Sequence, residues 1–139
     1  SGMVDMLSGL RAVHSGARAF GPKATSNDLG AKFKLSETAL AEVEHPVICT
    51  HAESGRKYLY VNRGFTLRFA NMTEDESKPL LEFLFQHAAR PEFTCRFNWR
   101  PGAMAFWDNL CTQHFAVNDY HGQTRLMHRI TIQGCAPQA

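Results

Sequence analysis

The spacing of apolar residues at the start of the chain is that of a helix. Four of them recur three positions apart between residues 4 and 15: Val4, Leu7, Leu10 and Val13. Such a stripe lets a helix pack against a sheet. Residues 17–35 then mix Gly, Pro, Ser, Asn and Lys without a period. We therefore predict a helix over 4–15 and a long mobile loop over 17–35, which either covers a site or is disordered.

From residue 45 the pattern changes to that of strands. Two runs rich in β-branched and aromatic residues, 45–50 and 57–61, are separated by the turn-forming sequence Glu53-Ser54-Gly55. Runs of this composition on either side of a glycine turn are typical of antiparallel partners. We predict a hairpin or meander pair here.

A helix is predicted within residues 73–90. Its buried face would be formed by apolar residues at helical spacing: Leu80, Leu81, Leu84, Phe85 and Ala88. Thr73 and Glu76 have the spacing of a capping box, but that start places Pro79 inside the helix, where proline removes a hydrogen bond. Ser77 as the N-cap leaves Pro79 in the tolerated first turn, so we favour a regular helix that begins there.

The last third of the chain alternates between apolar and polar residues. In residues 93–99 the apolar set lies on one side of an extended chain: Phe93, Cys95, Phe97 and Trp99. Residues 103–107, 112–117 and 126–132 are predicted as further strands, and Arg100-Pro101-Gly102 as a turn. Several short strands with an inserted helix indicate a mainly β fold with inserted helices, part of a double-stranded β-helix (jelly-roll) barrel.

Composition narrows the class of protein. The chain has 139 residues, which suits one domain. Fifteen scattered Lys and Arg are balanced by thirteen Asp and Glu, so no nucleic-acid surface is expected. No apolar run approaches the ~20 residues that cross a bilayer. Four widely separated cysteines are typical of reduced thiols in a cytoplasmic protein. Ser1-Gly2 ahead of Met3 resembles the remnant of a removed tag, so the domain is expected to span residues 3–139.

Three side chains in the last third are candidates for a metal or anion site. His114 follows Trp107-Asp108-Asn109 and would lie at the start of a strand, where a rigid backbone can present an imidazole to a metal ion. Arg125 and Arg129 are four positions apart, so both guanidiniums would lie on one face of a strand. They either bind a carboxylate or sulfonate or face solvent, and their spacing does not distinguish the two.

Several motifs resemble those of one enzyme family. They are His45-Pro46-Val47, Thr50-His51, Ser54-Gly55-Arg56-Lys57, Tyr60-Val61-Asn62-Arg63-Gly64-Phe65-Thr66, Arg90-Pro91-Glu92-Phe93, Trp107-Asp108-Asn109, Thr112-Gln113-His114 and Met127-His128-Arg129. Over about residues 7–134 the chain resembles the C-terminal half of the taurine dioxygenase family, also called the TauD/TfdA family. The resemblance implies a jelly-roll enzyme that uses Fe(II), 2-oxoglutarate and dioxygen to hydroxylate taurine, another sulfonate or an alkyl sulfate.

The resemblance also implies roles for single residues. His114 takes the place of the distal iron-binding histidine. Arg125 corresponds to the arginine that pairs with the remote carboxylate of 2-oxoglutarate, and Arg129 to one that lies by this cosubstrate and grips the sulfonate in sulfonate-using members. Phe65 resembles an aromatic residue that walls the substrate pocket, although ordinary core packing explains it equally well. Trp107 is expected to be structural.

One part of the family's pattern has no counterpart here. The His-X-Asp pair that supplies two further iron ligands lies upstream of the segment that corresponds to residues 4–15, so we expect a C-terminal portion that is inactive alone. His51-Ala52-Glu53 could replace the pair beside His114, but the resemblance places His51 in a hairpin turn. A non-catalytic module for anion binding or assembly is the alternative function. Exposed strand edges further predict a homo-oligomer.

Overall fold

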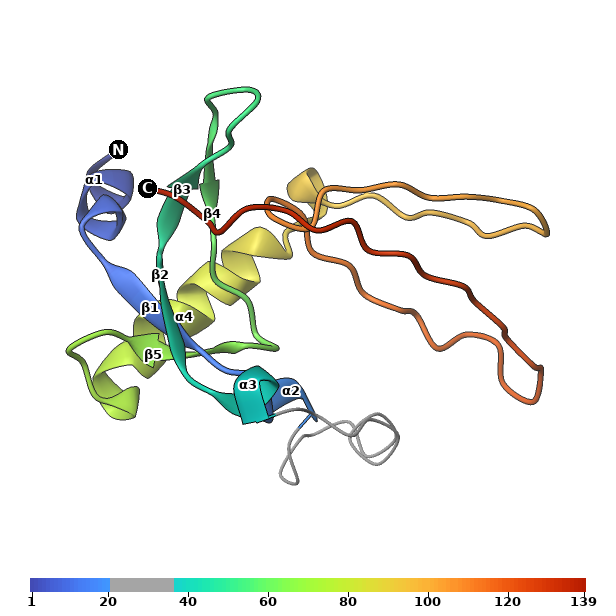
Figure 1. Cartoon of the computed structure of the whole chain (residues 1–139), viewed down its shortest axis with the longest axis horizontal. Coiled ribbons are helices and arrows are strands. Elements are labelled where there is room, and N and C mark those ends of the chain that lie inside the picture. The colour runs from blue at the N-terminus through green and yellow to red at the C-terminus, as the bar shows by residue number, and fades with distance from the viewer. Residues whose placement is uncertain (21–36) are drawn as a thin grey trace.

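Two small antiparallel sheets carry the packed part of the protein. The computed structural model describes residues 1–20 and 37–139 (Figure 1). In the first sheet, β1 (Arg11–His14) lies between β2 (Val43–Pro46) and β5 (Thr66–Phe69). In the second sheet, β3 (Ile48–Thr50) pairs with β4 (Lys57–Leu59).

Val47 joins the two sheets. Its N–H donates to the carbonyl oxygen of Leu10 at 3.0 Å, and its own carbonyl oxygen accepts a hydrogen bond from the N–H of Tyr60 at 2.8 Å. Its side chain is fully buried. β2 and β3 are therefore consecutive parts of one extended segment. The part before Val47 lies in the first sheet, and the part after it lies in the second sheet.

Helices pack against these sheets. The described residues form α1 (Gly2–Ser8), α2 (Ala17–Phe20), α3 (Glu37–Leu40), α4 (Glu74–Ala88) and the 3-10 helix η1 (Pro91–Phe93). α4 contacts β5, and α1 contacts β3 (Figure 1). The predicted loop over 17–35 is wrong for its first four residues, which form α2, and the rest of that prediction lies outside the described residues. No described helix is long and apolar enough to cross a membrane.

The hydrophobic core draws on both sheets and on α1 and α4. Its buried residues are Leu7, Ala12, Val47, Ile48, Val61, Phe69, Leu81, Leu84 and Phe85. Phe69 on β5 is the largest side chain that is fully buried. Because β5 lies between β1 and α4, this ring contributes to the packing of sheet against helix.

The predicted hairpin is confirmed. β3 and β4 are antiparallel, with Ile48 opposite Leu59 and Thr50 opposite Lys57. Gly55 in the connecting turn has a φ of 67°, the left-handed region that glycine enters without steric cost. Turn chemistry and strand composition therefore agree at this position.

The helix predicted near residue 73 exists, but the favoured start at Ser77 is wrong. Thr73 is the N-cap: its hydroxyl accepts from the N–H of Glu76 at 3.2 Å, and the Glu76 carboxylate accepts from the N–H of Thr73 at 2.8 Å. Pro79 lies inside the helix on its exposed side, where water can satisfy the carbonyl group left free. Ser77 is buried, and its hydroxyl accepts from the N–H of Phe69 at 3.0 Å.

The helix predicted over 4–15 is wrong after Ser8. α1 ends there, Gly9 follows, and β1 begins at Arg11. β1 pairs with a strand on each side, and Ala12 and Val13 are both buried. A central strand with both faces covered does not need to alternate between apolar and polar residues. Leu10 and Val13 could therefore fall at helical spacing although Val13 lies in a strand.

The strands predicted over 93–99, 103–107, 112–117 and 126–132 are also wrong. Residues 94–139 are all described and contain no hydrogen-bonded strand. They form two long loops that extend away from the sheets (Figure 1), here called the C-terminal excursions. The C-terminus then returns beside β3, where the N–H of Thr50 donates to the carbonyl oxygen of Gln138 at 2.8 Å. The turn at Arg100-Pro101-Gly102 is confirmed by the hydrogen bond from Ala103 to Arg100.

Replacing Phe69 with alanine should destabilise the protein by about 3–5 kcal/mol, because the cavity left in the core collapses only partly. Urea unfolding of the 139-residue chain measures this change. Phe83→Ala is the matched control, since Phe83 is 51% exposed on α4, and it should cost less than ~1 kcal/mol. Equal losses for the two variants would contradict the proposed core.

Candidate functional site

The three residues predicted to bind metal and anions all lie in the exposed C-terminal excursions. The ring of His114 contacts that of Trp107, with 5.4 Å between centroids. The guanidinium of Arg125 lies 5.5 Å from the centre of the Tyr120 ring. His114, Arg125 and Arg129 are exposed, and in the described part of the chain no hydrogen bond connects the histidine to either arginine. Their roles remain predictions.

Side chains hold the segment that leads to His114, residues 107–114. Asp108 accepts a hydrogen bond from the N–H of Leu110 at 2.6 Å. Gln113, next to His114, donates from its amide to the carbonyl oxygen of Val61 at 3.0 Å. The first bond fixes the turn within the segment, and the second anchors the segment to the body of the protein although it contains no strand.

His51 supplies a further anchor for this segment. It follows β3, and its Nε2 lies 2.9 Å from Asp108 Oδ2. Its Nδ1 lies 2.9 Å from the hydroxyl of Ser54. Hydrogen bonds to Leu110 and then to His51 hold the pKa of Asp108 below its ordinary value, so the carboxylate is charged at neutral pH.

The iron ligands considered from the sequence are not assembled around His114. Among the described residues, the group of His, Cys, Asp or Glu side chains with ligand atoms within 4.8 Å of one another is His51, Asp108 and Cys111. His114 is outside it, so the suggested set of His51, Glu53 and His114 is not formed. The described residues therefore do not provide the two histidines and one carboxylate that a facial iron site needs.

Phe65 lines a hollow of about 350 Å³ beside β1 and β2. Its ring is 39% exposed and meets the ring of Phe20 edge-on, with 5.8 Å between centroids. Its N–H donates to the side chain of Asn62 at 2.9 Å, which fixes the turn that carries it. Phe65 thus forms part of a pocket wall and not of the buried core.

The sequence did not reveal a cluster of His14, His45 and Tyr60 in the wall of the same hollow. The three ring centroids lie 5.4–5.6 Å apart. His14 is 6% exposed, its Nδ1 lies 3.2 Å from the hydroxyl of Thr66, and its Nε2 has no hydrogen-bond partner among the described residues. The three residues come from β1, β2 and the end of the hairpin, and no motif in the sequence connects them.

Burial keeps these histidines neutral. Desolvation and then His45 lower the pKa of His14 from 6.5 to about 4. Desolvation, and then the charge of Arg11, lower the pKa of His45. Desolvation also raises the pKa of Tyr60. At neutral pH the cluster is therefore uncharged.

The sequence pattern that defines the taurine catabolism dioxygenase TauD, TfdA family matches residues 2–131. The chain therefore belongs to this family, as its motifs predicted. Its relatives include α-ketoglutarate-dependent dioxygenases.

Individual relatives show how much of such an enzyme the chain represents. An alkylsulfatase of Acinetobacter baylyi is 38% identical over 128 residues, which are 90% of this chain and 40% of the relative. An α-ketoglutarate-dependent sulfate ester dioxygenase of Pseudomonas putida is 38% identical over 75% of this chain and 34% of its own length. The crystal structure of a taurine dioxygenase from Burkholderia xenovorans matches 80% of this chain and 32% of its own, with 35% identity and a TM-score of 0.61. The chain thus spans 40% or less of each relative.

Stability should fall as the pH is lowered from about 6.5 to 4. In that window the unfolded chain protonates His14 while the folded protein, in which its pKa is about 4, does not. The shift corresponds to about 3 kcal/mol. Urea unfolding of the wild type and His14→Gln at several pH values isolates this effect, because other groups titrate in both proteins. Parallel stability curves would show that His14 is not buried in its neutral form.

Proposed function

We propose that this chain is the C-terminal portion, residues 3–139, of a jelly-roll oxygenase that uses Fe(II) and 2-oxoglutarate. Its substrate is a small organic anion such as taurine, another sulfonate or an alkyl sulfate. The observation that carries the proposal is the family match over residues 2–131, together with relatives named for sulfate esters, alkyl sulfates and taurine.

The charges of the last segment support an anion site. Residues 120–139 contain two Arg and no Asp or Glu, so their formal charge is 2 − 0 = +2. Elsewhere Arg63, Arg90 and Arg96 each pair with a carboxylate. In the part of the chain that the structure describes, Arg125 and Arg129 pair with none. In the proposal, Arg125 binds the remote carboxylate of 2-oxoglutarate, and Arg129 lies by the cosubstrate and binds the anionic group of the substrate.

His114 is the residue of this chain proposed to bind iron. The hydrogen bond from Gln113 to Val61 fixes the position beside it. The further ligands have to come from outside the described residues. The wall that Phe65 shares with the neutral histidine cluster suits the apolar part of a small substrate.

The alternative function, a non-catalytic module for anion binding or assembly, follows from one observation. The described residues give His114 no second and third iron ligand. Such a module would bind sulfonates or 2-oxoglutarate through the same two arginines without turnover.

The assay uses the full natural polypeptide that contains this chain. Its activity should depend on His114, Arg125 and Arg129. With Fe(II), 2-oxoglutarate and a panel of sulfonates and sulfate esters, succinate and sulfite or sulfate should appear together. His114→Ala should abolish both products. Arg125→Ala should raise the KM for 2-oxoglutarate, and Arg129→Ala that for the substrate, each by about 10–100-fold, because a charge-assisted hydrogen bond is lost.

His121→Ala is the matched control for these variants, since it is an exposed histidine in the same excursion with no assigned role. It should keep full activity. Binding of sulfonates without any succinate would reject the enzyme and favour the module.

The 139-residue chain alone should associate. Its C-terminal excursions expose apolar side chains without a partner, among them Phe106 at 89% and Ile130 at 93%, and such patches drive association. Light scattering should detect a dimer or larger species, and Phe106→Lys with Ile130→Lys should reduce its mass. Thr131→Lys adds a charge at an exposed polar position and should not. A monomeric wild type would contradict this expectation.

A further inference from the structure

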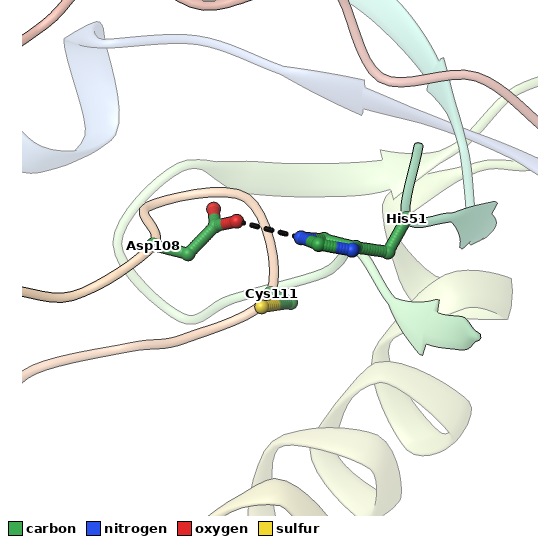
Figure 2. Close-up of side chains that lie close together, drawn as sticks. All are labelled: His51, Asp108 and Cys111. Atoms are coloured by element: carbon green, nitrogen blue, oxygen red, sulfur yellow. Dashed lines mark hydrogen bonds and ion pairs between the residues drawn. The ribbon is translucent and has the colours of Figure 1, made fainter. Parts of the chain in front are cut away.

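Three potential metal ligands meet where the turn after β3 touches residues 107–114. Figure 2 shows the His51 ring directed at the Asp108 carboxylate, with the Cys111 thiol on the same side of the ring. The ligand atoms of these three residues all lie within 4.8 Å of one another. His51 is far from the other two in the sequence, so the fold creates the cluster.

The electrostatics of the cluster favour a cation. His51 Nε2 lies 2.9 Å from Asp108 and 3.4 Å from Glu53. Among the described residues, these two carboxylates contact His51 and form no ion pair with a Lys or Arg. Two negative charges are thus gathered around one imidazole, and a divalent ion would neutralise them.

Ser54 can orient His51 for metal binding. Its hydroxyl lies 2.9 Å from Nδ1, and its backbone N–H donates to the same nitrogen at 3.3 Å, so the metal-binding tautomer exchanges the N–H contact for the hydroxyl one. When Nδ1–H donates to this hydroxyl, Nε2 carries the lone pair that a metal ion requires. A hydrogen bond of this kind on the second ring nitrogen is a common feature of metal-bound histidines. In the absence of metal, Nε2–H can instead donate to Asp108.

We propose that His51, Asp108 and Cys111 bind a divalent zinc-like ion, with water as the fourth ligand. One nitrogen, one oxygen and one sulfur donor suit Zn²⁺. Tetrahedral bond lengths place such donor atoms about 3.3–3.6 Å apart, so His51 and Asp108 open slightly from 2.9 Å and Cys111 moves inward. Cys111 is exposed, which leaves room for this movement, and its thiol proton is released to solvent on binding.

This site is separate from the iron site proposed at His114 and would have a different consequence. It ties residues 108 and 111 to the hairpin, three residues before His114. A bound ion would therefore fix the segment that carries His114 more firmly than the single hydrogen bond between His51 and Asp108.

Titration of the metal-free 139-residue chain with Co²⁺ tests the proposal. One equivalent should produce the visible bands of a tetrahedral site and a near-ultraviolet thiolate-to-cobalt charge-transfer band, and one equivalent of Zn²⁺ should abolish both. Cys111→Ser should lose the charge-transfer band. Asp108→Asn should raise the Kd for Co²⁺ by about tenfold or more.

Two controls separate this site from other cobalt binding. Cys135→Ser changes another exposed free cysteine and should keep the charge-transfer band. His114→Ala should keep it as well, whereas it abolishes activity if the proposed function is correct. The proposal is overturned if no charge-transfer band forms, if Cys111→Ser retains it, or if His114→Ala removes it. Circular dichroism checks that each variant is folded, and Asp108→Asn gives an independent answer if Cys111→Ser is not.

Discussion

The availability of a strand partner determines which parts of this chain form sheet. β1 has a partner on each side, so its backbone groups are satisfied and its residues are buried. Residues 93–99 alternate as clearly as any strand, yet Phe97 is 51% exposed and the segment forms no ladder. The backbone of an extended segment without a partner strand can form hydrogen bonds only with water. Its apolar face then has no neighbouring element to pack against. Strand propensity in this chain is therefore not sufficient for a strand.

The same constraint explains how the candidate site is organised. Without strands to hold them, residues 107–114 are anchored by side chains: Gln113 to Val61, and Asp108 to His51. These contacts fix the approach to His114. Arg125 and Arg129 lie farther along the same segment, and no hydrogen bond or ion pair among the described residues anchors them to the packed body.

Features that depend on neighbouring residues were predictable from the sequence, and features that depend on contacts between distant residues were not. The hairpin around Gly55 follows from turn chemistry and composition within a dozen residues. The start of α4 is also local, a capping box of Thr73 and Glu76. What excludes the favoured alternative is not local, because Ser77 accepts a hydrogen bond from Phe69, a contact across the core. The family and the turn at Gly102 also followed from the sequence. His14 did not, since its position depends on β1 being a central strand and its neighbours lie on other elements.

The excess positive charge of the chain lies in residues 120–139, beyond His114. Asp108 precedes it, and Glu53 lies by the same imidazole of His51, whereas Arg125 and Arg129 follow it in a stretch without acidic residues. The whole chain has a formal charge of +2, and residues 120–139 alone account for that excess. A guanidinium stays charged at every accessible pH, so this excess persists until an anion or a partner neutralises it.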